Sequence, residues 1–164
     1  MLIGIIADTH DNLPMIARAI VALRARRVDM MLHAGDFVAP FALKLLLKAD
    51  IPLIGVFGNN DGERRILSDL SDALHQGPHR FELEGRTIVM AHEPDVLAAA
   101  IEDGDDLAVC GHLHEPQIKV GAPLLVNPGE AGAWLSGRST GAVVDLRKMT
   151  AELVEFGRQE VTRL

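Results

Sequence analysis

The 164-residue chain contains no tyrosine, one tryptophan and one cysteine. The single cysteine, Cys110, excludes an internal disulfide framework and a cysteine-based zinc site, and it fits a reduced, cytoplasmic setting. No apolar stretch approaches the ~18 residues that a membrane helix needs. The N-terminal residues also lack the basic start and the long apolar run of a secretory signal. These absences predict a cytoplasmic protein without a membrane partner.

Positive charge is also scarce, because 23 Asp and Glu residues outnumber 16 Lys and Arg residues and give a formal net charge of −7. An acidic chain lacks the basic face that stable nucleic-acid binding needs. It can still bind a phosphate-containing ligand if metal ions supply positive charge locally. The content of hydrophobic residues, 48%, and of charged residues, 24%, is that of a globular protein. Together with the length, this composition predicts one domain over residues 1–164.

The first half of the chain alternates between apolar strands and helical patterns. We expect strands at Leu2–Ala7, Met30–Ala34 and Ile51–Phe57. We expect helices at Leu13–Arg27, Pro40–Lys48 and Glu63–His75. After Gly77-Pro78 the chain contains one further helix, at about 94–102, among strands at about 80–83, 87–91, 107–110, 117–120, 124–126, 141–145 and 151–156. This order favours an α/β fold with a partly parallel central sheet and further antiparallel strands packed with it.

Polar residues recur where the expected strands end. The segments are Asp8-Thr9-His10, Gly35-Asp36, Gly58-Asn59-Asn60-Asp61, His92 and Gly111-His112-Leu113-His114. In open α/β sheets, ligands bind beyond the carboxyl ends of the strands. We therefore expect these five segments to share one rim of the fold.

The candidate ligands at this rim are carboxylate, imidazole and amide groups, without a thiolate: Asp8, His10, Asp36, Asn59, His92, His112 and His114. This mixture of donors suits divalent ions such as Mn, Fe or Zn. Seven ligands are too many for one tetrahedral zinc ion, and they suit two ions about 3.5–4 Å apart with a bridging carboxylate. The two-residue spacing within each Asp-x-His or His-x-His pair would point both side chains to one side of an extended segment.

Each segment alone has a simple structural alternative. Asp-x-His is common in turns and helix caps, Gly-Asp is a common turn pair, and His-x-His also occurs as a surface pair. The joint occurrence of five such segments after strands favours a metal site over five independent turns.

The ordered set of segments resembles the calcineurin-like metallophosphoesterases. The short length and Asn127-Pro128-Gly129 resemble the small prokaryotic phosphodiesterase branch of that family, the YfcE/MJ0936-like group. The resemblance extends from Ile3 to about Gly129. It implies a four-layer α/β/β/α sandwich, in which two mixed β-sheets lie face to face with helices outside.

The resemblance also implies how the ligands are shared between two metal ions. The first ion would be bound by Asp8, His10, Asp36 and His114. The second would be bound by Asp36, Asn59, His92 and His112, so that Asp36 bridges the ions. The implied cofactors are two divalent ions, with Mn as the first choice and Fe, Ni, Zn or Mg as alternatives.

Three positions depart from the family pattern. Asn60 stands where many members have a histidine that helps to protonate the leaving group. An amide cannot act as a general acid at neutral pH, although it can hydrogen-bond a phosphoryl oxygen. Glu93 and Glu130 replace residues that are usually Gly and Ser. Two added carboxylates would disfavour some anionic substrates if they point into the site.

The expected function is hydrolysis of small-molecule phosphodiesters, in which a hydroxide bridging the two metal ions attacks phosphorus. The expected catalytic residues are Asp36, Asn59 and Asn60, with the amides stabilising charge on the phosphoryl oxygens. A diester carries less negative charge than a monoester, which suits an acidic protein. The alternative is a catalytically weak or inactive scaffold of the same fold that binds other proteins. A homo-oligomer is compatible with the sequence.

The remaining marked residues have structural interpretations. His33 is expected either to hydrogen-bond a metal ligand or to pack in the core, and Asp61 to shape its loop. Asn12 is expected to cap the helix that follows it, and Asp11 is expected either to cap this helix as well, which is favoured, or to bias the electric field of the site. His75 and His79 are expected in surface loops. Trp134 lies in a segment rich in Gly and Ser, where packing under the last strands and an interface role are both open.

Overall fold

The computed structural model describes residues 1–159 and contains two β-sheets and four helices. The six-stranded sheet has the order β11-β10-β1-β2-β3-β4 and contains β1 (Leu2–Ile6), β2 (Met30–His33), β3 (Leu53–Val56), β4 (Leu74–His75), β10 (Arg138–Asp145) and β11 (Thr150–Arg158). The five-stranded sheet has the order β5-β6-β7-β9-β8 and contains β5 (His79–Leu83), β6 (Arg86–Met90), β7 (Leu107–Val109), β8 (Gln117–Lys119) and β9 (Leu124–Asn127).

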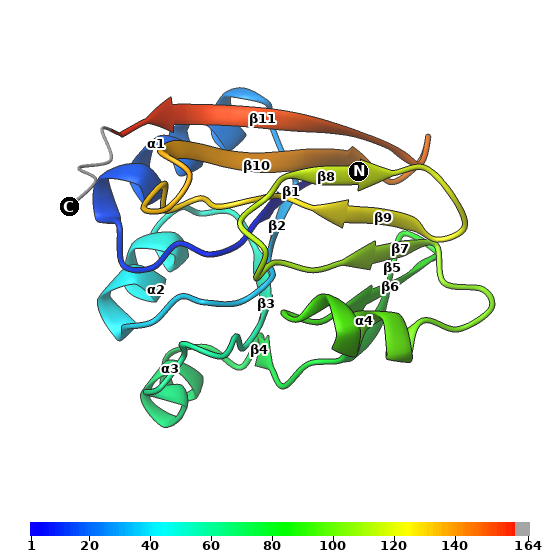
Figure 1. Ribbon diagram of the computed structural model, residues 1–164, viewed down its shortest axis with the longest axis horizontal. Coiled ribbons are helices and arrows are strands. Elements are labelled where there is room, and N and C mark those ends of the chain that lie inside the picture. The colour runs from blue at the N-terminus through cyan, green and yellow to red at the C-terminus, as the bar shows by residue number, and fades with distance from the viewer. Residues whose placement is uncertain (160–164) are drawn as a thin grey trace.

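The helices cover the outer faces of the two sheets. Figure 1 places three helices on one side and α4 (Pro94–Ala100) on the other. The three are α1 (Leu13–Ala25), α2 (Pro40–Leu47) and α3 (Arg64–Leu70). The predicted four-layer α/β/β/α sandwich of two mixed sheets is therefore confirmed. Among the described residues, no helix combines the length and the apolarity that a membrane crossing requires.

Strand β1 explains why the core forms as it does. Ile3 and Ile5 pack in the cluster between the two sheets, whereas Ile6 packs in the cluster between the larger sheet and its helices. Successive side chains of a strand point to opposite faces, so a strand covered on both faces must be apolar throughout. Full burial of an Ile side chain stabilises the fold by roughly 1.5–3 kcal/mol.

The strand directions bring five carboxyl ends to one rim. β1, β2 and β3 run parallel in the larger sheet, and β6 and β7 run parallel in the smaller one. The β2–β3 register pairs His33 with Gly55, so the segments after these two strands begin at the same level. The helix α1 begins directly after the first of these segments, where the Asn12 side chain accepts a hydrogen bond from Met15 N–H.

The helix expected over Glu63–His75 is wrong in its second half. The helix α3 ends at Leu70, Ser71 adopts an extended backbone, and residues 74–75 form β4. β4 pairs in parallel with β3, so backbone hydrogen bonding at the sheet edge overrides the helical pattern of the sequence. His75 and His79 are also not loop residues: they lie in β4 and β5, and their rings stack with centroids 3.7 Å apart.

Candidate metal centre

Asp8 is the buried anchor of the first part of the site. Its Oδ2 accepts a hydrogen bond of 3.0 Å from His112 N–H, which joins the segments after β1 and β7. Its Oδ1 lies 3.7 Å from His10 Nε2 and 3.4 Å from His114 Nε2. Asp8, His10 and His114 therefore form a compact group whose donor atoms lie within 4.8 Å of one another.

Asp36 occupies the centre of the site. Its Oδ2 lies 3.5 Å from His10 Nε2 and 3.4 Å from His92 Nε2. Its two oxygens also accept hydrogen bonds from Asn60, one from the backbone N–H at 2.9 Å and one from the side-chain amide at 2.7 Å. Asp36 thus lies between His10 and His92. Asp8, Asp36 and His92 make up a second group with the spacing of metal ligands.

Asn59 lies between the remaining two histidines. Its Oδ1 is 2.9 Å from His92 Nε2 and 3.0 Å from His112 Nδ1. The two imidazoles also approach each other, with 3.3 Å between His112 Nδ1 and His92 Nε2. Through these contacts, the structure brings all seven predicted ligands into one connected cluster.

The backbone at the site differs from the expectation. Positive φ angles occur at Asp8, His10, Asp36, His112 and His114, with values between 40° and 70°. The side chains within each two-residue pair therefore converge through left-handed turns and not through extended segments. Such conformations cost about 1–3 kcal/mol each for residues other than glycine, and they cluster at functional sites. The cost is consistent with a site selected for its geometry.

Two of the histidines are oriented by acceptors on the side away from the cluster. His92 Nδ1 lies 2.8 Å from the Ala34 carbonyl oxygen, so the proton on Nδ1 is donated there and Nε2 faces the cluster. His114 Nδ1 lies 3.4 Å from Glu130 Oε1, an ion-pair contact and not a hydrogen bond, and its Nε2 faces Asp8. A ligand histidine whose other nitrogen is held by a carbonyl or a carboxylate is a common arrangement in metal sites.

A close approach at Gly35 makes the His92 arrangement possible. Gly35 has a φ of 99°, and a Cβ atom there would lie 2.6 Å from His92 Nδ1. A side chain at this position would displace the imidazole from the Ala34 carbonyl. The glycine before Asp36 is therefore required by packing against a histidine 57 residues further along the chain.

The electrostatics of the cluster favour a cation. Burial opposes ionisation of Asp36, yet hydrogen bonds from His92 and Asn60 hold its pKa well below its usual range. Burial also opposes charging of His92, but the contact with Asp36 outweighs it and raises the pKa to about 9. Across residues 1–159, the ion pairs of Asp8 and Asp36 are with histidines alone.

Unpartnered atoms give the most direct test of whether a metal ion fits. Asp8 Oδ1 and His10 Nε2 are buried and have no hydrogen-bond partner within the described chain. An unpaired buried carboxylate oxygen carries a desolvation penalty of roughly 1–3 kcal/mol or more. A divalent ion between the two atoms would satisfy both, so the donors present fit a metal of the predicted kind.

A layer of hydrogen bonds lies beneath the candidate ligands. Gly35 N–H donates to His33 Nδ1, His33 Nε2 lies 3.1 Å from Thr9 Oγ1, and the Thr9 hydroxyl donates to the Asp36 carbonyl. His33 is fully buried and stacked on Phe37, which agrees with packing in the core, and its hydrogen bonds are with Gly35 and Thr9 and not with a candidate ligand. Burial lowers its pKa to about 3, which keeps the ring neutral. This chain connects the segments after β1 and β2.

Two neighbouring aspartates stabilise loops. Asp61 accepts hydrogen bonds from the N–H groups of Asp36, Val38 and Gly58, which confirms that it shapes its loop. The prediction that Asp11 caps the helix after it is wrong. Asp11 Oδ1 instead accepts a hydrogen bond from Ala39 N–H at the start of α2. The helix after Asp11 is capped by Asn12, as the sequence predicts.

The two added glutamates differ in position. Glu130 is fully buried, and its carboxylate accepts hydrogen bonds from the N–H groups of Trp134, Leu135 and Ser136 besides contacting His114. These contacts lower its pKa to about 2, although burial alone would raise it. Glu93 is the N-cap residue of α4 and makes no capping hydrogen bond with its side chain. Sequence reasoning marked Glu130 as unusual but missed its orienting contact with a histidine.

The sandwich and the donor cluster at its rim define a metallophosphoesterase. The chain belongs to the calcineurin-like phosphoesterase superfamily, whose domain model matches residues 1–149. It is 36% identical to phosphodiesterase MJ0936 from Methanocaldococcus jannaschii over 157 residues, which cover 90% of this chain and 95% of that protein. Membership confirms the resemblance carried by the strand-end segments and implies divalent metal ions as cofactors.

Solved structures agree with this assignment. The structure of an archaeal phosphodiesterase matches with a TM-score of 0.85 and 32% identity, over 94% of this chain and 99% of that chain. The structure of YfcE, a phosphoesterase from E. coli, matches with a TM-score of 0.68 and 20% identity, over 96% of this chain and 100% of that chain. At 20% identity, the match to YfcE shows a shared fold alone.

Proposed function

We propose that the protein is a phosphodiesterase whose active site binds two divalent metal ions. The observation that carries the proposal is the connected cluster of seven donors, in which buried Asp8 Oδ1 and His10 Nε2 have no partner among residues 1–159. The 36% identity to phosphodiesterase MJ0936 supports the same class of reaction. The substrate would be a small-molecule phosphate ester.

The two ions would share the ligands as the family resemblance implies. Asp8, His10, Asp36 and His114 would bind the first ion. Asp36, Asn59, His92 and His112 would bind the second. The central place of Asp36, between His10 and His92, supports its role as the bridge. The short contacts of Asn59 with His92 and His112 support the second set.

When bound, two divalent ions supply a water of low pKa as nucleophile and offset negative charge on the phosphoryl group. The protein contributes orientation and hydrogen bonds. Asn59 and Asn60 are exposed at the rim, where their amides can reach a phosphoryl oxygen. Each amide carries two N–H donors, so Asn60 retains one while the other binds Asp36. Such donors lower the barrier by stabilising charge that develops in the transition state.

The leaving group distinguishes this site from relatives with a histidine at position 60. Asn60 cannot donate a proton at neutral pH, and its amide nitrogen is held 2.7 Å from Asp36 Oδ2. Diesters whose alcohol or phenol departs without protonation are therefore the preferred substrates.

Metal-dependent hydrolysis tests the proposal. Protein stripped with a chelator is assayed on bis(p-nitrophenyl) phosphate and on p-nitrophenyl phosphate, with Mn, Ni, Mg or Zn added back. We expect diester hydrolysis that depends on the metal and exceeds monoester hydrolysis. Metal binding without turnover of any ester would favour the protein-binding scaffold, and a preference for the monoester would overturn the choice of diesters.

Two finer assignments belong to the same proposal, the preferred metal and the location. Manganese is the metal that we expect to support the highest activity, since the donors are oxygen and nitrogen without thiolate. A cytoplasmic location is proposed from the single cysteine, Cys110, whose burial raises its pKa to about 11 and leaves it unreactive. The sequence is also compatible with a homo-oligomer, and light scattering on the metal-loaded protein measures its oligomeric state.

A further inference from the structure

The chain has one tryptophan, and it is exposed beside the metal centre. Trp134 has 48% of its surface exposed, although large aromatic side chains are mostly buried in proteins. It lies in the segment between β9 and β10 that also contains Glu130. Trp134 is a member of none of the apolar clusters of residues 1–159.

Two hydrogen bonds place the indole at the first group of candidate ligands. Its Nε1–H donates to the carbonyl oxygen of His10 at 2.9 Å. Its backbone N–H donates to Glu130 Oε1, the same oxygen that lies 3.4 Å from His114 Nδ1. The indole nitrogen of Trp134 thus lies at the backbone of His10, and the Trp134 backbone is linked to His114 through Glu130.

The segment that carries the indole is fixed in advance. Glu130 accepts hydrogen bonds from the N–H groups of three consecutive residues, 134 to 136. Gly132 N–H donates to the Asp8 carbonyl at 2.9 Å, and a Cβ atom at Gly132 would lie 2.7 Å from the Thr9 carbonyl oxygen. A surface that is ordered before binding loses little conformational entropy when a ligand arrives. These contacts provide a rigid aromatic surface next to the metal ligands.

We propose that the exposed face of Trp134 stacks on a planar aromatic group, a nucleobase or an aryl ring, of the phosphodiester bound at the metal centre. The inference rests on the proposed function and narrows its substrate class. Aromatic rings stack on one another largely irrespective of their substituents. The exposed face of Trp134 would therefore favour substrates with a planar ring over substrates without one. Within the described chain, Asp8 and Asp36 form ion pairs with histidines and not with Lys or Arg. An uncharged aromatic group on the substrate suits such a site, because it needs no charged partner beside the metal centre.

Intrinsic fluorescence tests stacking without any turnover. Because the chain has one Trp and no Tyr, its emission reports on Trp134 alone. Protein in Mg²⁺ is titrated with adenosine 5′-monophosphate and, separately, with ribose 5-phosphate, which carries the same phosphate without the base. We expect saturable quenching by the nucleotide and not by the sugar phosphate. Equal responses to the two ligands, or no response to either, would overturn the proposal.

Substitutions test the same surface through kinetics. Trp134→Leu keeps apolar bulk without an aromatic face, and we expect it to raise KM for bis(p-nitrophenyl) phosphate about 10- to 100-fold. KM for an alkyl diester such as glycerophosphoethanolamine should change less than about 3-fold, and Trp134→Phe should recover most of the loss for the aryl diester. A nucleoside 2′,3′-cyclic phosphate, run in parallel, separates a nucleobase preference from an aryl preference.

Leu135→Ala provides the matched control. Leu135 is the next residue, is 73% exposed and also donates its backbone N–H to Glu130. Its side chain is aliphatic and therefore offers no aromatic face for stacking. We expect its kinetics to equal those of the unmodified protein. Equal shifts for aryl and alkyl diesters in Trp134→Leu would overturn stacking while leaving the phosphodiesterase intact. If the nucleotide quenches the fluorescence but the protein hydrolyses no ester, the proposed function is refuted while Trp134 remains a surface that binds aromatic rings.

Discussion

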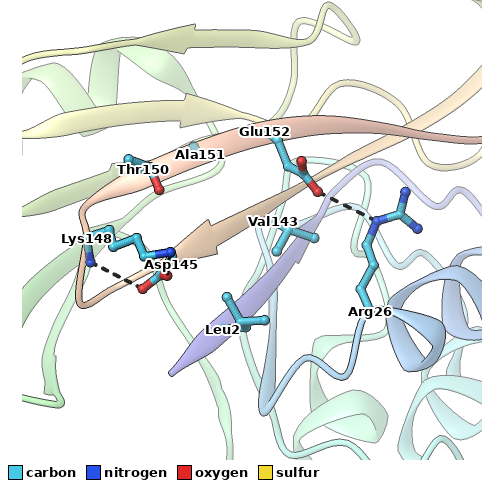
Figure 2. Close-up of a pocket in the computed structure, with 8 residues that line it drawn as sticks. All are labelled: Leu2, Arg26, Val143, Asp145, Lys148, Thr150, Ala151 and Glu152. Carbon is cyan, nitrogen blue, oxygen red and sulfur yellow. Dashed lines mark hydrogen bonds and ion pairs between the residues drawn. The ribbon is translucent and has the colours of Figure 1, made fainter.

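The carboxylates at the two ends of the strands are neutralised in different ways. At the amino ends, Asp106 before β7 pairs with Arg86 at 2.7 Å, and Asp145, which lies opposite Leu2, pairs with Lys148 at 3.5 Å. Figure 2 shows the cleft at this end, with the second of these pairs drawn. At the carboxyl ends, buried Asp8 and Asp36 face histidines, and no Lys or Arg pairs with either across residues 1–159.

This difference indicates at which end of the strands the protein needs a ligand. The cleft in Figure 2 is lined by Arg26 and Lys148, but both are already paired with acidic side chains. Charge there is balanced within the chain. At the opposite rim, the negative charge and the unpartnered atoms call for a cation from outside. The end of the strands with incomplete internal pairing is the one at which we propose the metal centre.

The largest effect is expected when the central carboxylate of the rim is removed. Asp36→Asn deletes the charge shared by both proposed metal sites, so we expect metal content near zero and a loss of hydrolysis of more than about 100-fold. Metal analysis and turnover of the diester measure the two effects. Asp106→Asn, which removes a carboxylate from the other end, should retain both. Full metal content in Asp36→Asn would contradict the comparison.

A smaller effect is expected from the carboxylate that orients His114. Glu130→Gln keeps an oxygen for the backbone N–H groups but removes the charge beside His114 Nδ1. Loss of such an outer partner lowers metal affinity about 10- to 100-fold. Calorimetric titration with Mn²⁺ gives the affinity, and the control is Glu155→Gln, because Glu155 forms its ion pairs with Arg138 and Arg158, away from the candidate ligands. An unchanged affinity would show that backbone contacts alone hold the histidine.

The buried His33 makes stability depend on pH. Its folded pKa of about 3 lies below the ordinary value of 6.5, so the unfolded state binds more protons between these pH values. The free energy of unfolding should therefore fall as the pH drops below 6.5, by up to about 1.4 kcal/mol per pH unit from this residue. Urea unfolding of the chelator-treated protein at several pH values measures the slope. His33→Gln should flatten it, and parallel curves for the two proteins would refute the assignment.

The smallest effect is expected at the amino ends of the strands. Arg86 is 37% exposed at its side chain and Asp106 is 26% exposed, so solvent screens their ion pair. Arg86→Met should reduce the free energy of unfolding by no more than about 1 kcal/mol. Asp106 keeps a second partner in Thr87 N–H. Metal affinity should be unchanged, and a metal defect in this variant would remove the distinction between the two ends.

Much of the fold was predictable because buried strands have a strong local signal. The apolar run at residues 2–7 and the polar residues that follow it locate β1 and its functional end without any other information. Where the prediction was wrong, long-range pairing decided the structure. Leu74 joins the sheet opposite Gly55, a contact that the helical pattern around residue 70 does not reveal.

The members of the rim were predictable as a set, but their geometry was not. His10 and His114 were selected by residue type and spacing, and the structure brings their rings within 5.2 Å of each other. The left-handed backbone of these residues depends on the segments packed around them. Asn60 and Glu130 were recognised as departures, but their partners, Asp36 and His114, depend on packing between distant segments.

The hydrogen bond from His112 N–H to Asp8 Oδ2 joins residues 104 positions apart. A chain emerging from the ribosome presents Asp8 first and His114 more than a hundred residues later. The first group of donors cannot assemble before the segment after β7 has packed against the segment after β1. An ion bound by Asp8, His10 and His114 would therefore mark a chain that has been synthesised and folded as far as His114.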